Sequence, residues 1–173
     1  WQKLLIGKEI LTKSKNIENI CYLDSDILIN YLSPNIFDFH SADKVSLVSQ
    51  FNNIPFDNVI TRKKIAILRN NFYSKKYPLN SALHMSIKEI YEFHNLQKQN
   101  DYCCTGLYII NLKKFANIFY KFYFKYNKNV SSITDGGEEA HMNYEIQKNC
   151  RVKYIDYRFQ ALWIFEMANK YPF

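Results

Sequence analysis

Hydrophobic residues are spaced along this chain in two ways, at helical intervals and in short continuous runs. Helical spacing is strongest in residues 112–126, where Phe115, Phe119, Phe122 and Tyr126 fall on one side of the predicted helix. An aromatic stripe of this kind is typical of a helix that packs against a core. The spacing predicts further helices at residues 1–13, 84–98, 138–148 and 161–171, and a short helix that opens at Ser33-Pro34.

The continuous apolar runs predict strands, at residues 20–24 with a continuation through Ile29, at 45–49, at 102–111 and at 152–155. Because predicted strands alternate with predicted helices, the expected class is α/β. Residues 52–100 fit neither pattern clearly. They are either a lid or an insertion near a ligand, or an ordinary solvated surface region.

Length and composition are those of one globular domain, predicted to span residues 1–173. Hydrophobic residues make up 47% and charged residues 23%, whereas the aromatic share of 17% is high. No apolar run is long enough to span a bilayer, and Trp1 does not open a signal peptide. The chain starts without Met, so we expect a fragment of a longer polypeptide, in which missing segments could attach it to a membrane.

The formal net charge of +7 is compatible with binding to nucleic acid or to an acidic membrane surface. Of the 23 basic residues 19 are Lys, and Asn, Ile, Tyr and Phe are also abundant, as expected of AT-rich codons. Coding bias therefore explains much of the charge, and no nucleic-acid partner is expected. The four cysteines lack zinc-site spacing, which favours reduced thiols in a cytoplasmic or membrane-associated protein.

The candidate chemistry begins with Asp24-Ser25-Asp26, at the end of the first predicted strand. Side chains at positions i and i+2 of a strand face the same side, so Asp24 and Asp26 would converge if the strand runs straight. Two carboxylates beside an apolar core need a neutralising partner, and Mg²⁺ or Mn²⁺ prefers such oxygen ligands. Asp-x-Asp also occurs by chance, so a metal site and a coincidence both stay open.

Two further segments carry candidate chemistry. Thr105-Gly106 opens a strand, where a small residue and a Gly let a ligand approach the backbone, or where a β-bulge serves packing alone. Glu138 and Glu139 follow a predicted turn at residues 135–137. They are either paired functional carboxylates or acidic residues that suit the first turn of a helix.

Taken together, these segments resemble glycosyltransferase family 8, whose members have the GT-A fold. The Asp-x-Asp strand of the family is similar to Tyr22–Asp26. Its Gly-containing strand, which runs into Asn-Leu-Lys-Lys, is similar to Cys104–Lys114, and its acidic helix is similar to Glu138–Asn143. Trp1–Gly7 and Arg158–Gln160 resemble flanking segments of the family. The resemblance covers most of the chain outside residues 52–100. It implies a GT-A-like mixed sheet flanked by helices, in a truncated form.

The resemblance also implies an activity, the transfer of a hexose from a nucleotide-diphosphate sugar to a hydroxyl of a glycan, lipid or protein acceptor. Retention of the anomeric configuration is favoured. Asp24 and Asp26 would bind Mn²⁺ or Mg²⁺, which holds the diphosphate, and Ser25 lies between them in the donor site.

The remaining implied roles fall to five residues. Lys3 would lie near the phosphate and the sugar, and Thr105 and Gly106 would line the donor sugar. Glu138 and Glu139 would be the catalytic carboxylates, one in contact with the sugar and one on its reactive face. A front-face displacement and a covalent intermediate both stay open.

The chain departs from the family pattern. Cys104 and Gln160 each replace an Asn, and Glu138-Glu139-Ala140 replaces Asp-Gln-Asp. A nucleotide-binding strand and a metal-binding His of the family would lie before Trp1 and after the last helix. A catalytically degenerate GT-A-fold domain with a carbohydrate-binding or structural role is therefore the alternative. A nucleic-acid-binding module is a weaker one.

Overall fold

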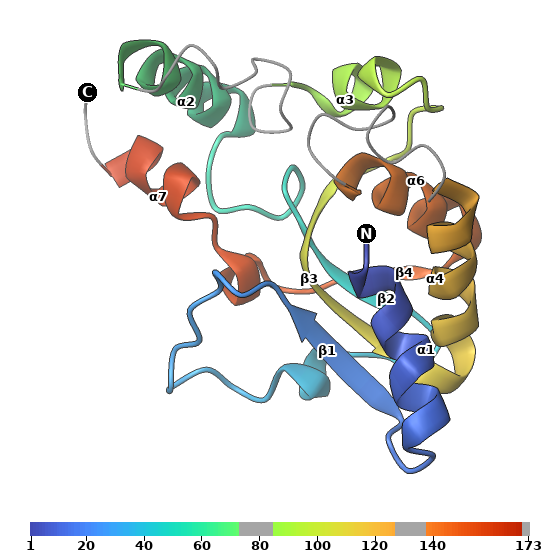
Figure 1. Ribbon diagram of the computed structural model, residues 1–173. Coiled ribbons are helices and arrows are strands. Elements are labelled where there is room, and N and C mark those ends of the chain that lie inside the picture. The colour runs from blue at the N-terminus through green and yellow to red at the C-terminus, as the bar shows by residue number, and fades with distance from the viewer. Residues whose placement is uncertain (73–84, 127–137, 171–173) are drawn as a thin grey trace.

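A computed structural model describes residues 1–72, 85–126 and 138–170, and within them the fold is α/β, with a four-stranded mixed sheet flanked by helices (Figure 1). The elements are α1 (Lys3–Lys13), β1 (Asn19–Leu23), η1 (Ile36–Phe39), β2 (Val45–Ser49), α2 (Asn58–Phe72), α3 (Ile87–Phe93), β3 (Cys103–Asn111), α4 (Leu112–Tyr126), α6 (Glu139–Asn149), β4 (Val152–Tyr154), η3 (Tyr157–Gln160) and α7 (Trp163–Lys170). The class predicted from the alternation of strands and helices is confirmed.

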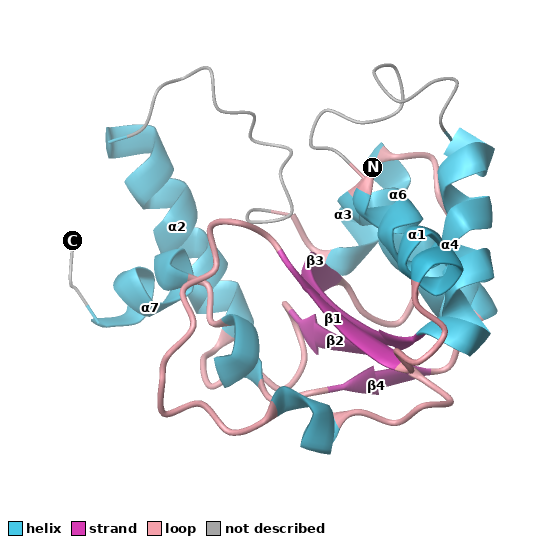
Figure 2. Cartoon of the chain, turned by 60° about the horizontal axis from the view of Figure 1, so that its bottom comes forward, coloured by secondary structure: helices cyan, strands magenta, loops and turns pink. Residues whose placement is uncertain are grey.

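Strand β3 is one of the two inner strands of the sheet and lies between β1 and β2. The strand order is β1-β3-β2-β4, with β3 antiparallel to β1 and β2, and β2 parallel to β4 (Figure 2). Alternate residues of β3 enter different cores, as the period of a strand requires. Tyr108 and Ile110 join the core that contains residues of α1 and α4, whereas Leu107 and Ile109 join the core that contains residues of α2 and α7.

A β-bulge interrupts the pairing of β3 with β2. Leu47 pairs with Tyr108, but the next residue, Val48, pairs with Cys104, so residues 105–107 have no partner on β2. The ladder between β1 and β3 is regular and continues to Leu23 opposite Leu107. The prediction of a bulge or close backbone approach at Gly106 is confirmed, and the bulge sets the backbone of Thr105 and Gly106 apart from the regular sheet.

Helices α1 and α4 pack closely against each other on one side of the sheet. Gly7 lies at this contact, where an added Cβ would lie 3.3 Å from Ile110 and 3.4 Å from Leu112 and Ala116. The aromatic stripe of α4 faces the core as predicted, with Phe115, Phe119 and Phe122 buried. The packing fixes α1, and with it Lys3, against the start of the site described below.

Several predicted bounds need correction. The first strand does not continue through Ile29, because the N–H of Ile27 donates to the carbonyl of Asp24 and closes a turn. Leu28 is consequently 97% exposed. The short helix begins at Ile36 rather than at Ser33-Pro34, because the Asn35 side chain accepts a hydrogen bond from the N–H of Phe37 and caps it.

Residues 52–100 contain two helices, α2 and α3, and residues 73–84 of this stretch lie outside the described part. The helix predicted at 84–98 is shorter than expected. Ser86 and Glu89 form a capping box that starts α3, and Asn95, with a φ of 55°, ends the helical path. The turn predicted at residues 135–137 lies outside the described residues, as does Tyr171, the last residue of the final predicted helix.

The helices of the described segments include none that is both long and apolar enough to cross a bilayer. All four cysteines are free, and Cys103 is fully buried in the core around β3. Cys103 therefore acts as a small apolar core residue, as predicted, whereas Cys21, Cys104 and Cys150 are only partly buried.

Candidate functional site

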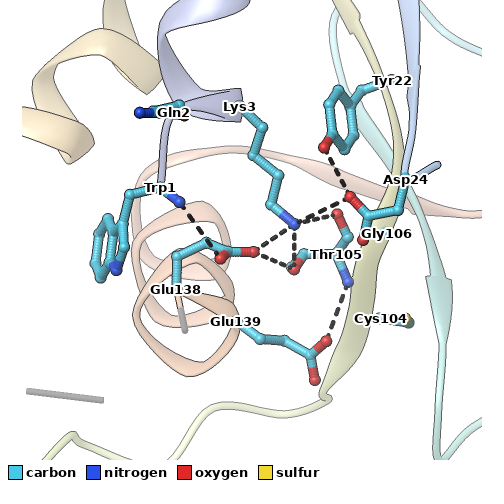
Figure 3. Close-up of a pocket in the computed structure, with 10 residues that line it drawn as sticks. All are labelled: Trp1, Gln2, Lys3, Tyr22, Asp24, Cys104, Thr105, Gly106, Glu138 and Glu139. Atoms are coloured by element: carbon cyan, nitrogen blue, oxygen red, sulfur yellow. Dashed lines mark hydrogen bonds and ion pairs between the residues drawn. The ribbon is translucent and has the colours of Figure 1, made fainter. Parts of the chain in front are cut away.

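A pocket of about 400 Å³ lies where the start of α1, the end of β1, the bulge of β3 and the start of α6 meet (Figure 3). Its lining residues are Trp1, Gln2, Lys3, Tyr22, Asp24, Cys104, Thr105, Gly106, Glu138 and Glu139. Six of the eight residues predicted for the site are among them. Ser25 and Asp26 are the exceptions.

Lys3 occupies the centre of the pocket. Its ammonium group donates to the carbonyl of Thr105 at 2.9 Å and to the hydroxyl of the same residue at 3.2 Å. It forms an ion pair with Glu138 Oε1 and lies 3.9 Å from Asp24 Oδ1. The side chain is only 9% exposed, so the ammonium links α1, β1, β3 and α6 in a largely desolvated setting.

Asp24 enters the pocket directly after β1. Its N–H donates to the carbonyl of Gly106 at 2.8 Å, which extends the pairing of β1 and β3 by one bond. Its Oδ1 accepts a hydrogen bond of 2.7 Å from the hydroxyl of Tyr22, whose ring stacks on Tyr108 with centroids 5.0 Å apart. The carboxylate is thus held in one orientation and remains 40% exposed to the pocket.

Ser25 and Asp26 lie in the turn that follows, and both are exposed. The expected convergence of Asp24 and Asp26 rested on a strand that runs straight past residue 24. Because β1 ends at Leu23, the alternation of a strand does not apply to these two carboxylates, and Asp26 does not line the pocket.

Gly106 is required by the close approach of two side chains. A Cβ at this position would lie 2.7 Å from the Gln160 amide and 2.9 Å from Asp24 Oδ2. Thr105, next to it, donates from its hydroxyl to Glu138 Oε1 at 3.1 Å. The bulge therefore brings the backbone of β3 against Asp24 and presents a hydroxyl to α6.

Glu138 is the ionised member of the acidic pair. It is the N-cap residue of α6, and its side chain is directed at Lys3 rather than at the helix. Burial acts to raise the pKa of Glu138, but the hydrogen bond and charge of Lys3 outweigh it and leave this pKa below its ordinary value.

Glu139 lies in a different setting. Its Oε1 accepts from Gln50 Nε2 at 3.2 Å, and its Oε2 lies 3.5 Å from the N–H of Thr105. Burial is the main cause that raises the pKa of Glu139 to about 7, and the charge of Glu138 acts in the same direction. Hydrogen bonds from Thr105 and Tyr102 oppose the rise in part. Glu139 can therefore hold or release a proton near neutral pH.

Some residues of the site escaped the sequence analysis. Tyr22 orients Asp24, and its place two residues before Asp24 on the same strand was an available signal. Gln160 belongs to a segment that resembles the family and departs from its pattern, but neither feature predicts a contact with β3. In the orientation that gives both ends of its amide a hydrogen-bond partner, the nitrogen donates to the carbonyl of Cys104 at 3.2 Å and the oxygen accepts from the N–H of Leu107 at 3.1 Å. It thus pairs backbone groups that the bulge separates.

The side chains of the pocket suit the hydroxyl groups of a polar ligand. Three carboxyl groups surround one ammonium, so bound hydroxyl groups would find acceptors at Asp24, Glu138 and Glu139. Among residues 1–72, 85–126 and 138–170, no three His, Cys, Asp or Glu side chains are grouped so that they could hold a metal ion.

Comparison of the chain with protein-family models, with curated proteins and with solved structures finds no match.

Proposed function

We propose that this chain belongs to a glycosyltransferase of the GT-A type, which moves a hexose from a nucleotide-diphosphate sugar to an acceptor hydroxyl. One observation carries the proposal. The residues that the resemblance to family 8 singled out come from separate parts of the chain, yet Lys3, Asp24, Thr105-Gly106 and Glu138-Glu139 line one pocket. A chance resemblance between short motifs gives no reason for this convergence.

The chemistry of the pocket agrees with a sugar ligand. Carboxylates accept hydrogen bonds from sugar hydroxyls, and Gly106 lets a ligand approach the backbone of β3. The two acidic neighbours differ in protonation, since Glu138 is held ionised by Lys3 while Glu139 titrates near neutral pH. Carboxyl groups whose environments separate their pKa values in this way supply the acid and base roles that group transfer needs.

The Mn²⁺ or Mg²⁺ ion stays a prediction. Asp24 and Asp26 would be its protein ligands beside the diphosphate oxygens, and the ion would act as a Lewis acid on the leaving diphosphate. Asp24 faces the pocket, but Asp26 is exposed on the turn and does not line it.

The exposed position of Asp26 favours a second candidate function, a GT-A-like domain that binds carbohydrate without catalysis. Cys104 lines the pocket where the family carries an Asn, and burial keeps its thiol neutral by raising its pKa to about 12. This replaces an amide with a weak hydrogen-bonding group.

The test is release of nucleoside diphosphate from a panel of nucleotide-sugars, with Mn²⁺ present. The proposal predicts release by the wild-type protein and a loss of roughly a hundredfold or more in Asp24→Asn. Asp43→Asn is the matched control, because Asp43 pairs with Arg151 on the surface, away from the pocket.

Three outcomes separate the candidates. Release that depends on Asp24 but not on Asp43 supports glycosyl transfer. Sugar binding that Asp24→Asn abolishes, without release from any donor, supports the non-catalytic domain. Equal release by the wild type and Asp24→Asn contradicts a catalytic site in this pocket.

A further inference from the structure

Gln50 connects the pocket to a part of the fold that the sequence did not associate with it. It directly follows β2, is only 4% exposed, and directs Nε2 to Glu139 Oε1 at 3.2 Å. Among the described residues its own Oε1 has no hydrogen-bond partner. A buried amide with one half unsatisfied is costly, so the bond to Glu139 is the reason the structure offers for a polar residue here.

Arg62 of α2 holds the backbone of Gln50 from the other side. Arg62 is 7% exposed, and its guanidinium donates to the carbonyl of Gln50 at 3.2 Å and from Nε to Asn58 Oδ1 at 2.6 Å. It lies 3.8 Å from the centroid of the Phe51 ring and 5.4 Å from that of Phe165. A guanidinium that is stacked, hydrogen-bonded and buried has one orientation available to it.

We propose that Arg62 and Gln50 are positioning residues for Glu139. Arg62 fixes the backbone of Gln50, and the Gln50 side chain then fixes one oxygen of Glu139 while the N–H of Thr105 faces the other. The inference rests on the proposed function in one respect, the catalytic role of Glu139; the contacts that position Glu139 do not depend on it. It also gives α2, in the stretch that the sequence left undecided, a defined part in the site.

Glu139 interacts electrostatically with groups from several elements, and Arg62 is one of them. The ionisable groups that act on Glu139 or on which it acts are Lys3 from α1, Glu138 from α6, Tyr102, Cys103 and Cys104 from β3, and Arg62 from α2. Loss of the Gln50 donor removes a hydrogen bond to the charged form of Glu139. Loss of the Arg62 charge removes a favourable interaction with the same form. Both changes raise the pKa of Glu139.

The experiment is a carbon-13 NMR titration of protein labelled at the Glu carboxyl carbons, with Glu139→Gln used to assign the signal. Gln50→Met keeps the length of the side chain and removes the donor, and it also removes the unsatisfied Oε1. Arg62→Met removes the charge, and Arg62→Lys restores it without the fixed fork of donors. Arg151→Met, at an exposed Arg, is the matched control.

We expect the pKa of Glu139 to rise by roughly half a unit to one unit in Gln50→Met and in Arg62→Met. Arg62→Lys should return it toward the wild-type value, and Arg151→Met should leave it unchanged. An unshifted pKa in folded Gln50→Met overturns the proposal, and this variant decides alone if Arg62→Met does not fold. The titration needs no donor sugar, so absence of glycosyl transfer and failure of this inference give different results.

Discussion

Glu138 and Glu139 are adjacent in sequence, yet their carboxyl groups meet opposite conditions. Glu138 is paired with the Lys3 ammonium, whereas Glu139 is held by the neutral donors of Gln50, Thr105 and Tyr102. The difference follows from the start of α6, where consecutive residues point in different directions around the helix axis. One residue is thereby kept ionised and its neighbour is left able to exchange a proton.

The raised pKa of Glu139 makes its contribution to stability depend on pH. Between about 4.5, its ordinary value, and about 7, the folded protein keeps a proton that the unfolded chain has released. This contribution is present below pH 4.5 and is lost as the pH rises through 7. Glu139→Gln, which stays neutral, should therefore gain roughly 2 kcal/mol on the wild type between pH 5 and pH 8.

Urea unfolding of both proteins at the two pH values measures this difference. Glu9→Gln is the control, because Glu9 is exposed on α1 and pairs only with Lys13 among the described residues. It should follow the wild type at both pH values. Equal changes in the free energy of unfolding for the wild type and Glu139→Gln would show that Glu139 is ionised throughout.

At the scale of elements, the bulge of β3 shapes the pocket. It sets Thr105 and Gly106 apart from the ladder with β2, and Gln160 from η3 pairs the backbone groups on either side. Asp24 reaches the pocket because its N–H continues the ladder to Gly106. The geometry of the site thus depends on a local irregularity in an inner strand, β3, supported by a side chain distant in sequence.

Gly106→Ala tests this dependence. Its Cβ would lie 2.7 Å from the Gln160 amide and 2.9 Å from Asp24 Oδ2, so one or both side chains must move. We expect a loss of about 1–3 kcal/mol in the free energy of unfolding, measured by thermal or urea denaturation. Gly7→Ala is the comparison, since its nearest contact is the flexible end of Ile110 at 3.3 Å, and a helical Ala gains about 1 kcal/mol in propensity. Equal losses in the two variants would contradict this account of the bulge.

The pattern of hydrophobic residues correctly predicted the helices and strands whose bounds are specified by the neighbouring sequence alone. The helix at 112–126 and the strand at 45–49 match α4 and β2 because an aromatic stripe and a short apolar run specify them. The strand after Leu23 was overextended because the apolar residues of the turn and loop are exposed, and pattern alone does not separate an exposed apolar run from a buried one.

The candidate site was predictable only where a motif marked it. The short motifs named Lys3, Asp24, Gly106 and the acidic pair, and the fold brings these together. Gln50 and Arg62 carry no motif, and they reach Glu139 across 89 and 77 positions of sequence. Such contacts arise from how β2, α2 and α6 pack, which hydrophobic periodicity does not specify.

At the scale of the molecule, two of the three hydrophobic clusters among the described residues share one sheet. Phe119 belongs to the core on the side of α1 and α4, and Phe165 belongs to the core on the side of α2 and α7. Because β3 supplies alternate side chains to both cores, unfolding of one core would also remove the side chains of β3 that pack in the other. The described part of the chain should therefore unfold as one cooperative unit.

Two core substitutions check this. Phe119→Ala and Phe165→Ala, at residues no more than 1% exposed, should each cost about 3–5 kcal/mol and should each move a single transition. Phe124→Ala is the control, because this ring is 50% exposed on the same helix as Phe119. Urea unfolding followed by circular dichroism and by tyrosine fluorescence reports the transitions. Two separated transitions in either core variant would show that the cores unfold independently.

The hydroxyl of Tyr108 donates to the backbone carbonyl of Lys3 at 2.8 Å, from a side chain that is otherwise fully buried. The position of the lysine is thus set by its main chain, while the chemistry of the pocket is set by its side chain. This division makes the pocket open to redesign. Lys3→Arg keeps the charge that pairs with Glu138 and presents a different head group to the pocket, while the tyrosine anchor on the main chain stays in place.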